Sequence, residues 1–427
     1  YIGDKMSTPL GNRKNIVLLG RRNSGKSSIF NLLIDQDKSI VADYLGTTTD
    51  PVYHMMELLP YGPVKIVDTA GIDDEGLVGQ KRVDKTRLEI EDADLLVYVI
   101  DANDFCSEDI YLEDGSMVAK PTVYIVNKCH DSIDRDHIKS KIESYIEKYK
   151  QVKEDNEKNN KNEKNSSKEG ASKEGPSIVF TDLVSSRQES RKLIIESLVD
   201  ILSSLEPDRG LIDGLIRPGD KALLVVPIDS EAPKGRLILP QVQVIRECLD
   251  MGVMVSLVRD LELKRALEEM GHIDLVITDS QVFKEVASLV NESIDLTSFS
   301  ILFARQKGDI DHLVRGARHI EKLRDGDRIL IAESCSHTSN HEDIGTVKIP
   351  NLIRNKTGKD IEFDFSHGKD FKRDLSKYSL IIQCGGCMLT RSNMMVRINR
   401  ARMAGVPITN YGVALAYLTG ALDRVVY

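Results

Sequence analysis

A short apolar run that enters a glycine-rich turn and leaves it as a helix constrains this chain more than any other feature. Residues 15–20 read Asn-Ile-Val-Leu-Leu-Gly, residues 21–27 read Arg-Arg-Asn-Ser-Gly-Lys-Ser, and residues 27–34 carry apolar side chains at helical spacing. This context predicts a phosphate-binding loop, because successive backbone N–H groups and a helix N-terminus can surround phosphate oxygens. We therefore expect the chain to begin with a nucleotide-binding α/β domain.

Each polar residue of the loop has an expected role. The ammonium group of Lys26 is expected to neutralise the β- and γ-phosphates, and the hydroxyl of Ser27 to coordinate Mg²⁺. The full set of expected nucleotide contacts in the loop is Asn23, Ser24, Gly25, Lys26, Ser27 and Ser28.

Two further motifs indicate a switch that responds to the γ-phosphate. Asp68-Thr-Ala-Gly71 follows a predicted strand, so Asp68 can hold the magnesium shell and the N–H of Gly71 can contact the γ-phosphate. Thr48, in the loop Gly-Thr-Thr-Thr-Asp at 46–50, is expected to ligate Mg²⁺ in the triphosphate state. Together with Lys26 these residues form the expected catalytic set.

Catalysis of hydrolysis is expected to be slow and to depend on potassium. Ile72 stands where many GTPases carry a glutamine that orients the attacking water. Asn23 resembles the loop asparagine of the potassium-dependent GTPases of the tRNA-modification and Era-like class, so a K⁺ ion held there could stabilise transition-state charge.

The base-recognition motif departs from Asn-Lys-x-Asp, because His130 follows Asn127, Lys128 and Cys129 at the aspartate position. A carboxylate accepts from both guanine N1–H and N2–H, whereas a neutral imidazole offers one acceptor. Asp131 is expected to replace the missing carboxylate after a shift of one residue. Thr-Asp at 181–182 is a weak version of the final base-contacting loop. GTP and GDP are the expected ligands.

A group of thiols in the last hundred residues predicts a metal centre. Cys335-Ser-His337 and Cys384-Gly-Gly-Cys387 each follow a predicted strand, so they can meet at the carboxyl edge of one parallel sheet. Three cysteines with an exchangeable fourth ligand fit an iron–sulfur cluster, and three cysteines with a histidine fit zinc. His337 is a ligand, a neighbour of the cluster or an ordinary loop residue on this pattern.

Alternation of apolar and helical segments predicts three α/β domains with mainly parallel sheets. The chain has 427 residues, and domains commonly hold roughly 100–200. We expect a P-loop GTPase domain at 1–207 and two smaller α/β domains at 208–322 and 323–427. Strands are expected at 15–20, 64–68, 94–101, 122–127, 177–180, 221–227, 253–258, 273–278, 296–303, 329–333 and 378–383.

Residues 148–176 interrupt the first domain with Lys, Glu, Asn and Ser and almost nothing apolar. Such a segment buries too little surface to offset the entropy of ordering. We expect a disordered insertion there.

Composition narrows the class of protein. The net charge of −9 argues against a general nucleic-acid binder, whose affinity rests on Lys and Arg. No apolar run reaches the roughly 18 residues that a membrane span needs. Six cysteines in so long a chain indicate reduced thiols in a cytosol-like compartment. Met6 is the true start, or a preceding segment has been removed.

With these residues in place, the chain resembles the HydF family, the GTPase scaffolds that mature FeFe-hydrogenases. The resemblance runs from about Met6 onward and includes the loop at 20–27, Gly-Thr-Thr-Thr-Asp-Pro-Val at 46–52 and Asp-Thr-Ala-Gly-Ile-Asp-Asp-Glu-Gly at 68–76. It continues in Pro-Ile-Asp-Ser-Glu-Ala-Pro-Lys-Gly-Arg-Leu-Ile-Leu-Pro-Gln at 227–241, Ser-Phe-Ser-Ile-Leu-Phe-Ala at 298–304 and Gly-Val-Pro-Ile-Thr-Asn-Tyr-Gly at 405–412.

The resemblance implies a domain at 208–322 that dimerises and a domain at 323–427 that holds a 4Fe–4S cluster on Cys335, Cys384 and Cys387. Gln383 stands where the family commonly has histidine, which favours exchangeable ligation of the fourth iron. The implied cargo is a diiron precursor. The implied partners are the two radical-SAM maturases and apo FeFe-hydrogenase, with the nucleotide state biasing partner binding through Thr48 and residues 68–79.

A second interpretation is an Era-like or tRNA-modification-like GTPase with a zinc-stabilised interaction domain. Hydrogenase chemistry implies an anaerobe, so the expected location is its cytoplasm or the matrix of an anaerobic organelle. We expect a homodimer that binds neither membrane nor nucleic acid.

Overall fold

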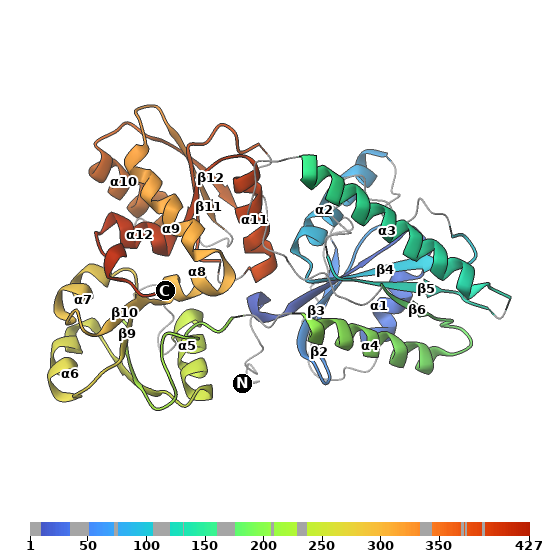
Figure 1. Ribbon diagram of the computed structural model, residues 1–427, viewed down its shortest axis with the longest axis horizontal. Coiled ribbons are helices and arrows are strands. Elements are labelled where there is room, and N and C mark those ends of the chain that lie inside the picture. The colour runs from blue at the N-terminus through green and yellow to red at the C-terminus, as the bar shows by residue number, and fades with distance from the viewer. Residues whose placement is uncertain are drawn as a thin grey trace. The chain divides into compact units, whose positions relative to one another are not determined.

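The computed structural model in Figure 1 describes most of the chain. The described residues are 10–34, 51–71, 76–105, 120–130, 132–159, 176–205, 209–228, 237–333, 344–368, 371, 374–386 and 389–427. By their contacts they divide into two compact units, 1–207 and 208–427.

The first unit is built on a six-stranded sheet in the order β2-β3-β1-β4-β5-β6. Only β2 runs antiparallel to its neighbour, and the other pairs are parallel. The strands are β1 (Lys14–Leu19), β2 (Val52–Leu58), β3 (Gly62–Asp68), β4 (Leu95–Asp101), β5 (Thr122–Asn127) and β6 (Ser177–Phe180). The five strands expected from apolar runs are confirmed, and β2 is an addition.

Helices cover both faces of this sheet, as Figure 1 shows. Ile16 and Leu18 of β1 point into a core with α1 (Lys26–Ile34) and α4 (Arg187–Ser204). Val17 and Leu19 point into a second core with α2 (Gly76–Asp92) and α3 (Arg135–Asn159). Because β1 is apolar on both faces, its sequence shows a continuous run rather than alternation. The sequence did not predict β2, because it is a half-buried edge strand whose polar and apolar residues do not alternate regularly.

The expectation of a disordered insertion at 148–176 is wrong for its first part. Helix α3 continues to Asn159, so residues 148–159 have helical backbone. The segment is rich in Lys and Glu, which are good helix formers, and an existing helix adds residues without a new nucleation step. Residues 160–175 lie outside the described part of the chain.

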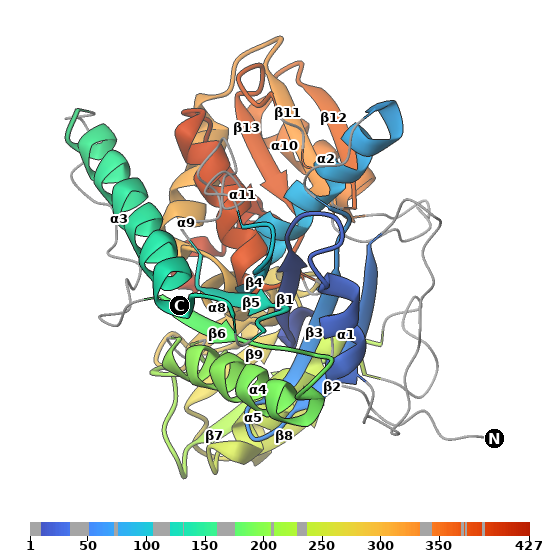
Figure 2. The same cartoon turned by 90° about the vertical axis from the view of Figure 1, so that its right-hand side faces the viewer.

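The second unit contains two four-stranded, all-parallel sheets, ordered β10-β9-β7-β8 and β12-β11-β13-β14. Figure 2 shows β11, β12 and β13 side by side. The strands are β7 (Lys221–Val225), β8 (Met254–Val258), β9 (Leu275–Thr278), β10 (Asp295–Ser298), β11 (Arg328–Glu333), β12 (Glu362–His367), β13 (Leu380–Gln383) and β14 (Ile408–Asn410). The helices are α5 (Leu239–Asp250), α6 (Leu263–Glu269), α7 (Phe283–Leu289), α8 (Phe299–Lys307), α9 (Ile310–Arg318), α10 (Ile349–Thr357), α11 (Arg391–Met403) and α12 (Tyr411–Leu418).

Helix α8 joins the two sheets of this unit. The strand expected at 296–303 is wrong in its second half, because β10 ends at Ser298 and the helix follows. The Ser298 hydroxyl accepts the backbone N–H of Ile301 at 3.3 Å and caps the helix. An uncharged apolar run is ambiguous between the two structures until such a cap is seen. α8 is buried along most of its length and contacts α5, α11 and α12.

The division expected between residues 322 and 323 cuts through one body. A single hydrophobic core runs from Leu223 of β7 through α9 to the sheet β12-β11-β13-β14, the third sheet of the chain. Helix α9 packs on β14 of that sheet. A Cβ placed on Gly316 of α9 would stand 1.9 Å from the carbonyl oxygen of Ile408, so only glycine permits this approach. The helix at 310–318 thus belongs with the third sheet, upstream of the expected boundary. Among the described residues, no helix is long and apolar enough to cross a membrane.

Candidate functional site

The phosphate loop lies between β1 and α1 and requires glycine at two positions. Gly20 has φ of +140° and Gly25 has φ of +102°. A Cβ on Gly20 would stand 2.3 Å from the carbonyl oxygen of Val99, and one on Gly25 would stand 2.2 Å from Asn127 Nδ2. Any side chain at Gly20 or Gly25 would collide with Val99 of β4 or Asn127 of β5, so the loop can pack against these strands only with glycine at both positions.

Lys26 is buried at the first turn of α1, with 7% of its surface exposed. Its ammonium group donates to the carbonyl oxygens of Gly20 at 2.8 Å and Arg21 at 2.6 Å. These bonds hold the positive charge at the loop, where it can meet phosphate oxygens.

Ser27 and Asp68 form the candidate magnesium site. The Ser27 hydroxyl donates to Asp68 Oδ2 at 2.7 Å, and Asp68 Oδ1 is buried with no hydrogen-bond partner among the described residues. Burial raises the pKa of Asp68, while the Ser27 hydrogen bond and the charge of Lys26 act in the opposite direction. A hydroxyl in the first turn of α1 and a carboxylate oxygen at the carboxyl end of β3 fit Mg²⁺.

The base-recognition motif is tied to the phosphate loop. Asn127 Nδ2 donates to the carbonyl oxygen of Ser24 at 3.1 Å, and Lys128 Nζ donates to that of Asn23 at 2.9 Å. Lys128 also pairs with Asp101 Oδ2 at 2.5 Å. The parallel register places these segments at one edge, since Asp101 lies opposite Asn127. The two expected nucleotide motifs are therefore adjacent.

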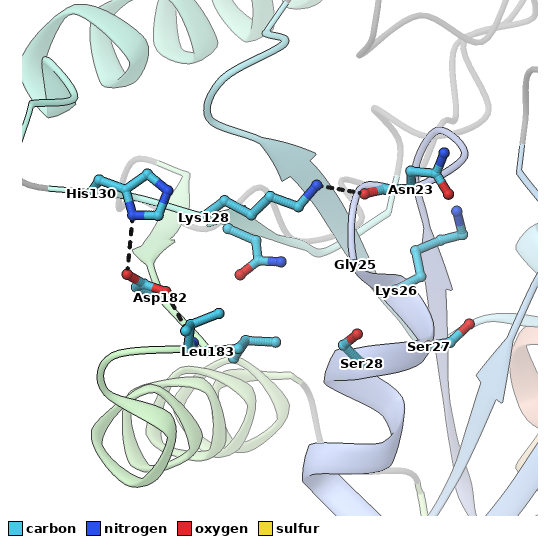
Figure 3. A pocket seen from close by; sticks show the side chains of 11 residues that line it. Asn23, Gly25, Lys26, Ser27, Ser28, Lys128, His130, Asp182 and Leu183 are labelled. Carbon is cyan, nitrogen blue, oxygen red and sulfur yellow. Dashed lines mark hydrogen bonds and ion pairs between the residues drawn. The ribbon is translucent and has the colours of Figure 1, made fainter.

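A cavity of about 520 Å³ extends between these loops (Figure 3). Lys26, Ser27 and Ser28 lie at one end, and His130 and Asp182 point toward each other at the other. Its full lining is Asn23, Gly25, Lys26, Ser27, Ser28, Asn127, Lys128, His130, Asp182, Leu183 and Val184. Asp182 was not among the expected contacts, and the weak Thr-Asp signal at 181–182 was the only pointer to it. Ser24 is buried within the phosphate loop, and Gly71 is buried shortly after the end of β3.

Several expected site residues lie outside the part of the chain that the structure describes. They are Thr48, Ile72, Asp131, Cys335, His337 and Cys387. Their predicted roles stay predictions. Within the described residues, no three His, Cys, Asp or Glu side chains come together as a metal site.

Cys384 is the described member of the thiol set. It is half-buried directly after β13, and its N–H donates to the carbonyl oxygen of Ala332 at 2.9 Å. Gly386 follows with φ of +64°, and a Cβ there would stand 2.6 Å from Met394 Sδ. The glycine thus permits a tight turn against α11. A half-buried thiol at this edge of the sheet matches the chemistry of an iron–sulfur ligand.

A buried lysine supports this loop from α8. Lys307 is 3% exposed, and its ammonium group donates to the carbonyl oxygens of Gly386 at 3.1 Å and Leu389 at 2.8 Å. Sequence reasoning missed it, because a lysine at a helix C-terminus usually faces solvent. Its burial fixes the backbone on both sides of residues 387–388.

Gln383, immediately before Cys384, is fully buried. Neither its Oε1 nor its Nε2 has a hydrogen-bond partner among the described residues. Buried amides rarely stay unpaired, so the Gln383 side chain beside Cys384 can still accept and donate hydrogen bonds.

Three family models match separate segments of the chain. The model of the hydrogen maturase F dimerization domain matches residues 211–308, and that of the hydrogen maturase F tetramerization domain matches residues 311–427. The 50S ribosome-binding GTPase model matches residues 15–128. The first unit is thus a GTPase domain that binds GTP and GDP, and the second carries oligomerization domains.

Relatives of the MnmE and Der kind match only the GTPase domain of this chain. The tRNA modification GTPase MnmE of Heliobacterium modesticaldum is 38% identical over 120 residues, 28% of this chain and 26% of the relative. GTPase Der of Xanthomonas campestris pv. campestris is 36% identical over 134 residues, 30% of this chain and 28% of the relative. The chain spans little more than a quarter of the length of these relatives.

Among solved structures, a variant of Aquifex aeolicus Era bound to GDP.AlF4- is 19% identical, with a TM-score of 0.29, covering 57% of this chain and 92% of that chain. The phosphate loop, the Ser27–Asp68 hydrogen bond and the cavity agree with the GTPase match, and residues 211–308 and 311–427 match two hydrogen maturase F domains. This chain belongs to the HydF (hydrogen maturase F) family.

Proposed function

We propose that this protein is a GTP-controlled scaffold that holds a 4Fe–4S cluster and carries a diiron precursor to apo FeFe-hydrogenase. The observation that carries the proposal is the match of residues 211–308 and 311–427 to the two hydrogen maturase F domains behind a GTPase domain. The radical-SAM maturases are the proposed source of the cargo. A homodimer built through residues 208–322 is the proposed assembly.

Cys335, Cys384 and Cys387 are the proposed cluster ligands, and His337 is proposed as a further ligand or a neighbour of the cluster. Thiolates supply the bonds that iron–sulfur clusters use, and a fourth iron without a fixed protein ligand leaves a position that can be exchanged. Lys307 and Gly386 support this proposal, because they fix the described backbone that follows Cys384. The exchangeable position suits a carrier, which has to bind its cargo without enclosing it.

The nucleotide is proposed to act as a switch with slow, K⁺-stimulated hydrolysis. Lys26, Thr48, Asp68 and Gly71 are the proposed catalytic residues, with Mg²⁺ on Ser27, Thr48 and Asp68 and K⁺ at Asn23. A bound Mg²⁺ would neutralise phosphate charge there. Partner affinity has to differ between nucleotide states for such a switch to work.

Anaerobic reconstitution with iron and sulfide tests the cluster. We expect about four irons per chain and an EPR signal after reduction, with uptake strongly reduced in Cys384→Ser. Cys248→Ala is the matched control, because Cys248 is a buried thiol of α5. Stoichiometric zinc without a reducible cluster would contradict the proposal.

That zinc outcome would favour an interaction-domain GTPase acting in RNA modification or ribosome assembly. The similarity of the first unit to MnmE and Der is the observation behind this second candidate. Activation of apo-hydrogenase by the loaded protein, and its absence with Cys384→Ser, separates the two functions.

A further inference from the structure

The pair His130–Asp182 lies at the end of the cavity that faces away from the phosphate loop (Figure 3). His130 Nδ1 stands 3.3 Å from Asp182 Oδ2. The imidazole is 56% exposed and the carboxylate 11%. A carboxylate thus lies where the base of a nucleotide would be read, although the residue at the motif's aspartate position is a histidine.

Backbone hydrogen bonds hold the two loops together. The N–H of Cys129 donates to the carbonyl oxygen of Thr181 at 3.0 Å, and the N–H of Thr181 donates to that of Val126 at 2.8 Å. The loop after β5 therefore cannot move away from the loop after β6 without breaking ladder-like bonds. The closeness of His130 and Asp182 follows from the sheet, since β5 and β6 are parallel neighbours.

Asp182 is itself fixed by the turn that follows it. The N–H of Val184 donates to its Oδ1 at 3.0 Å, and the Ser185 hydroxyl donates to its Oδ2 at 2.7 Å. The Ser185 and Val184 hydrogen bonds lower the pKa of Asp182, so the group is an anion at neutral pH. With two lone pairs on each oxygen, the carboxylate can accept further bonds, and the contact to the exposed His130 is the one open to exchange.

We propose that Asp182 recognises guanine through its N1–H and N2–H groups, and that His130 covers this carboxylate until the base displaces it. Guanine presents two donors on that edge, which a carboxylate can accept as a pair. Adenine presents an acceptor at N1 and would meet the carboxylate lone pairs. The guanine specificity that the aspartate of an Asn-Lys-x-Asp motif usually provides would then come from Asp182 in the loop after β6.

The proposal rests on guanine-nucleotide binding by the first unit. It is tested with equilibrium binding of fluorescent GDP to the full chain, competed with GDP, XDP, IDP and ADP. In Asp182→Asn the amide offers a donor to the C2 carbonyl of xanthine. We expect GDP affinity to fall about 10- to 100-fold and XDP affinity to rise. IDP, which lacks the 2-amino group, should lose its disadvantage against GDP.

The ratio of GDP to XDP affinity is the primary readout, because misfolding would weaken both ligands together. The asparagine carbonyl can still accept the N–H of Val184, so the turn is retained. Asp200→Asn is the matched control, since Asp200 is exposed on α4 away from the cavity lining. His130→Ala is expected to bind GDP as tightly as the wild type or more tightly, because it removes the group that covers Asp182.

Two results would overturn the proposal. In the first, Asp131→Asn inverts the preference for GDP over XDP while Asp182→Asn leaves it unchanged, which would assign the reading carboxylate to residue 131. In the second, His130→Ala weakens GDP as much as Asp182→Asn does, which would make the imidazole the reader. Equal wild-type affinity for GDP and ADP would instead contradict guanine recognition itself.

Discussion

The nucleotide cavity and the loop that begins at Cys384, here called the thiol loop, both lie at carboxyl ends of parallel strands. The hydrogen bonds of their polar groups differ. In the cavity, Lys26, Ser27 and Lys128 bond to groups of the same site. At the thiol loop, Lys307 is bonded to backbone, but the amide of Gln383 has no partner among the described residues. The first site is largely preformed by its own side chains and keeps Asp68 Oδ1 as an unpaired atom, whereas at the second both polar atoms of Gln383 lack a partner among the described residues.

The largest expected effect tests whether the two regions are independent. Lys26→Met removes the ammonium group at the phosphates and is expected to weaken GTP binding at least about 100-fold, since charge-assisted bonds to phosphate are strong. Iron uptake on reconstitution should match the wild type. Nucleotide titration and iron analysis measure the two, and a parallel loss of iron would show that the regions are coupled.

Lys307→Met tests the support of the thiol loop. The substitution leaves the carbonyl oxygens of Gly386 and Leu389 without their buried donor, so we expect a loss of stability of about 2 kcal/mol in denaturant unfolding. GTP affinity should not change. Lys264→Met is the control, because Lys264 is exposed on α6, and it should cost less than about 0.5 kcal/mol. Equal stability of the two variants would show that Lys307 does not stabilise the thiol loop.

The dependence of GTP hydrolysis on potassium tests the nucleotide cavity by itself. We expect GTP hydrolysis to be roughly tenfold faster in K⁺ than in Na⁺, about 1.4 kcal/mol of barrier. Asn23→Ala should abolish the difference between the two salts without changing iron uptake. Equal wild-type rates in both salts would contradict a K⁺ site.

The smallest expected effect is on folding stability. Asp68→Asn removes the buried negative charge of the nucleotide site and so tests what that charge costs the folded state. Because burial raises the pKa of Asp68, the folded nucleotide-free protein binds this proton more tightly than the unfolded chain does. The ionised group therefore destabilises the fold above the ordinary aspartate pKa, and the cost vanishes as the pH falls below it. We expect the variant to be more stable at pH 7, by less than about 1 kcal/mol, and equal to the wild type in strong acid. A variant less stable at pH 7 would show that the ionised carboxylate contributes favourably.

Strands β1, β4 and β5 of the first unit were predictable because they are buried on both faces and read as apolar runs. The half-exposed β2 and β12 carry mixed patterns, and β14 has three residues, so their sequences give too weak a signal. The α8 helix was misread as strand because an apolar run has no period of its own, and only the Ser298 cap distinguishes the two.

The sequence by itself determined the phosphate loop and the family, because these rest on contiguous motifs whose backbone geometry is local, and it predicted Ser27 and Asp68 as the magnesium ligands. The tertiary structure decided which distant groups share a site. It placed Asp182 against His130 through the pairing of β5 with β6, and it buried Lys307 under the thiol loop by packing α8 against α11. Such contacts depend on how strands and helices are ordered in space, which no local pattern of residues encodes.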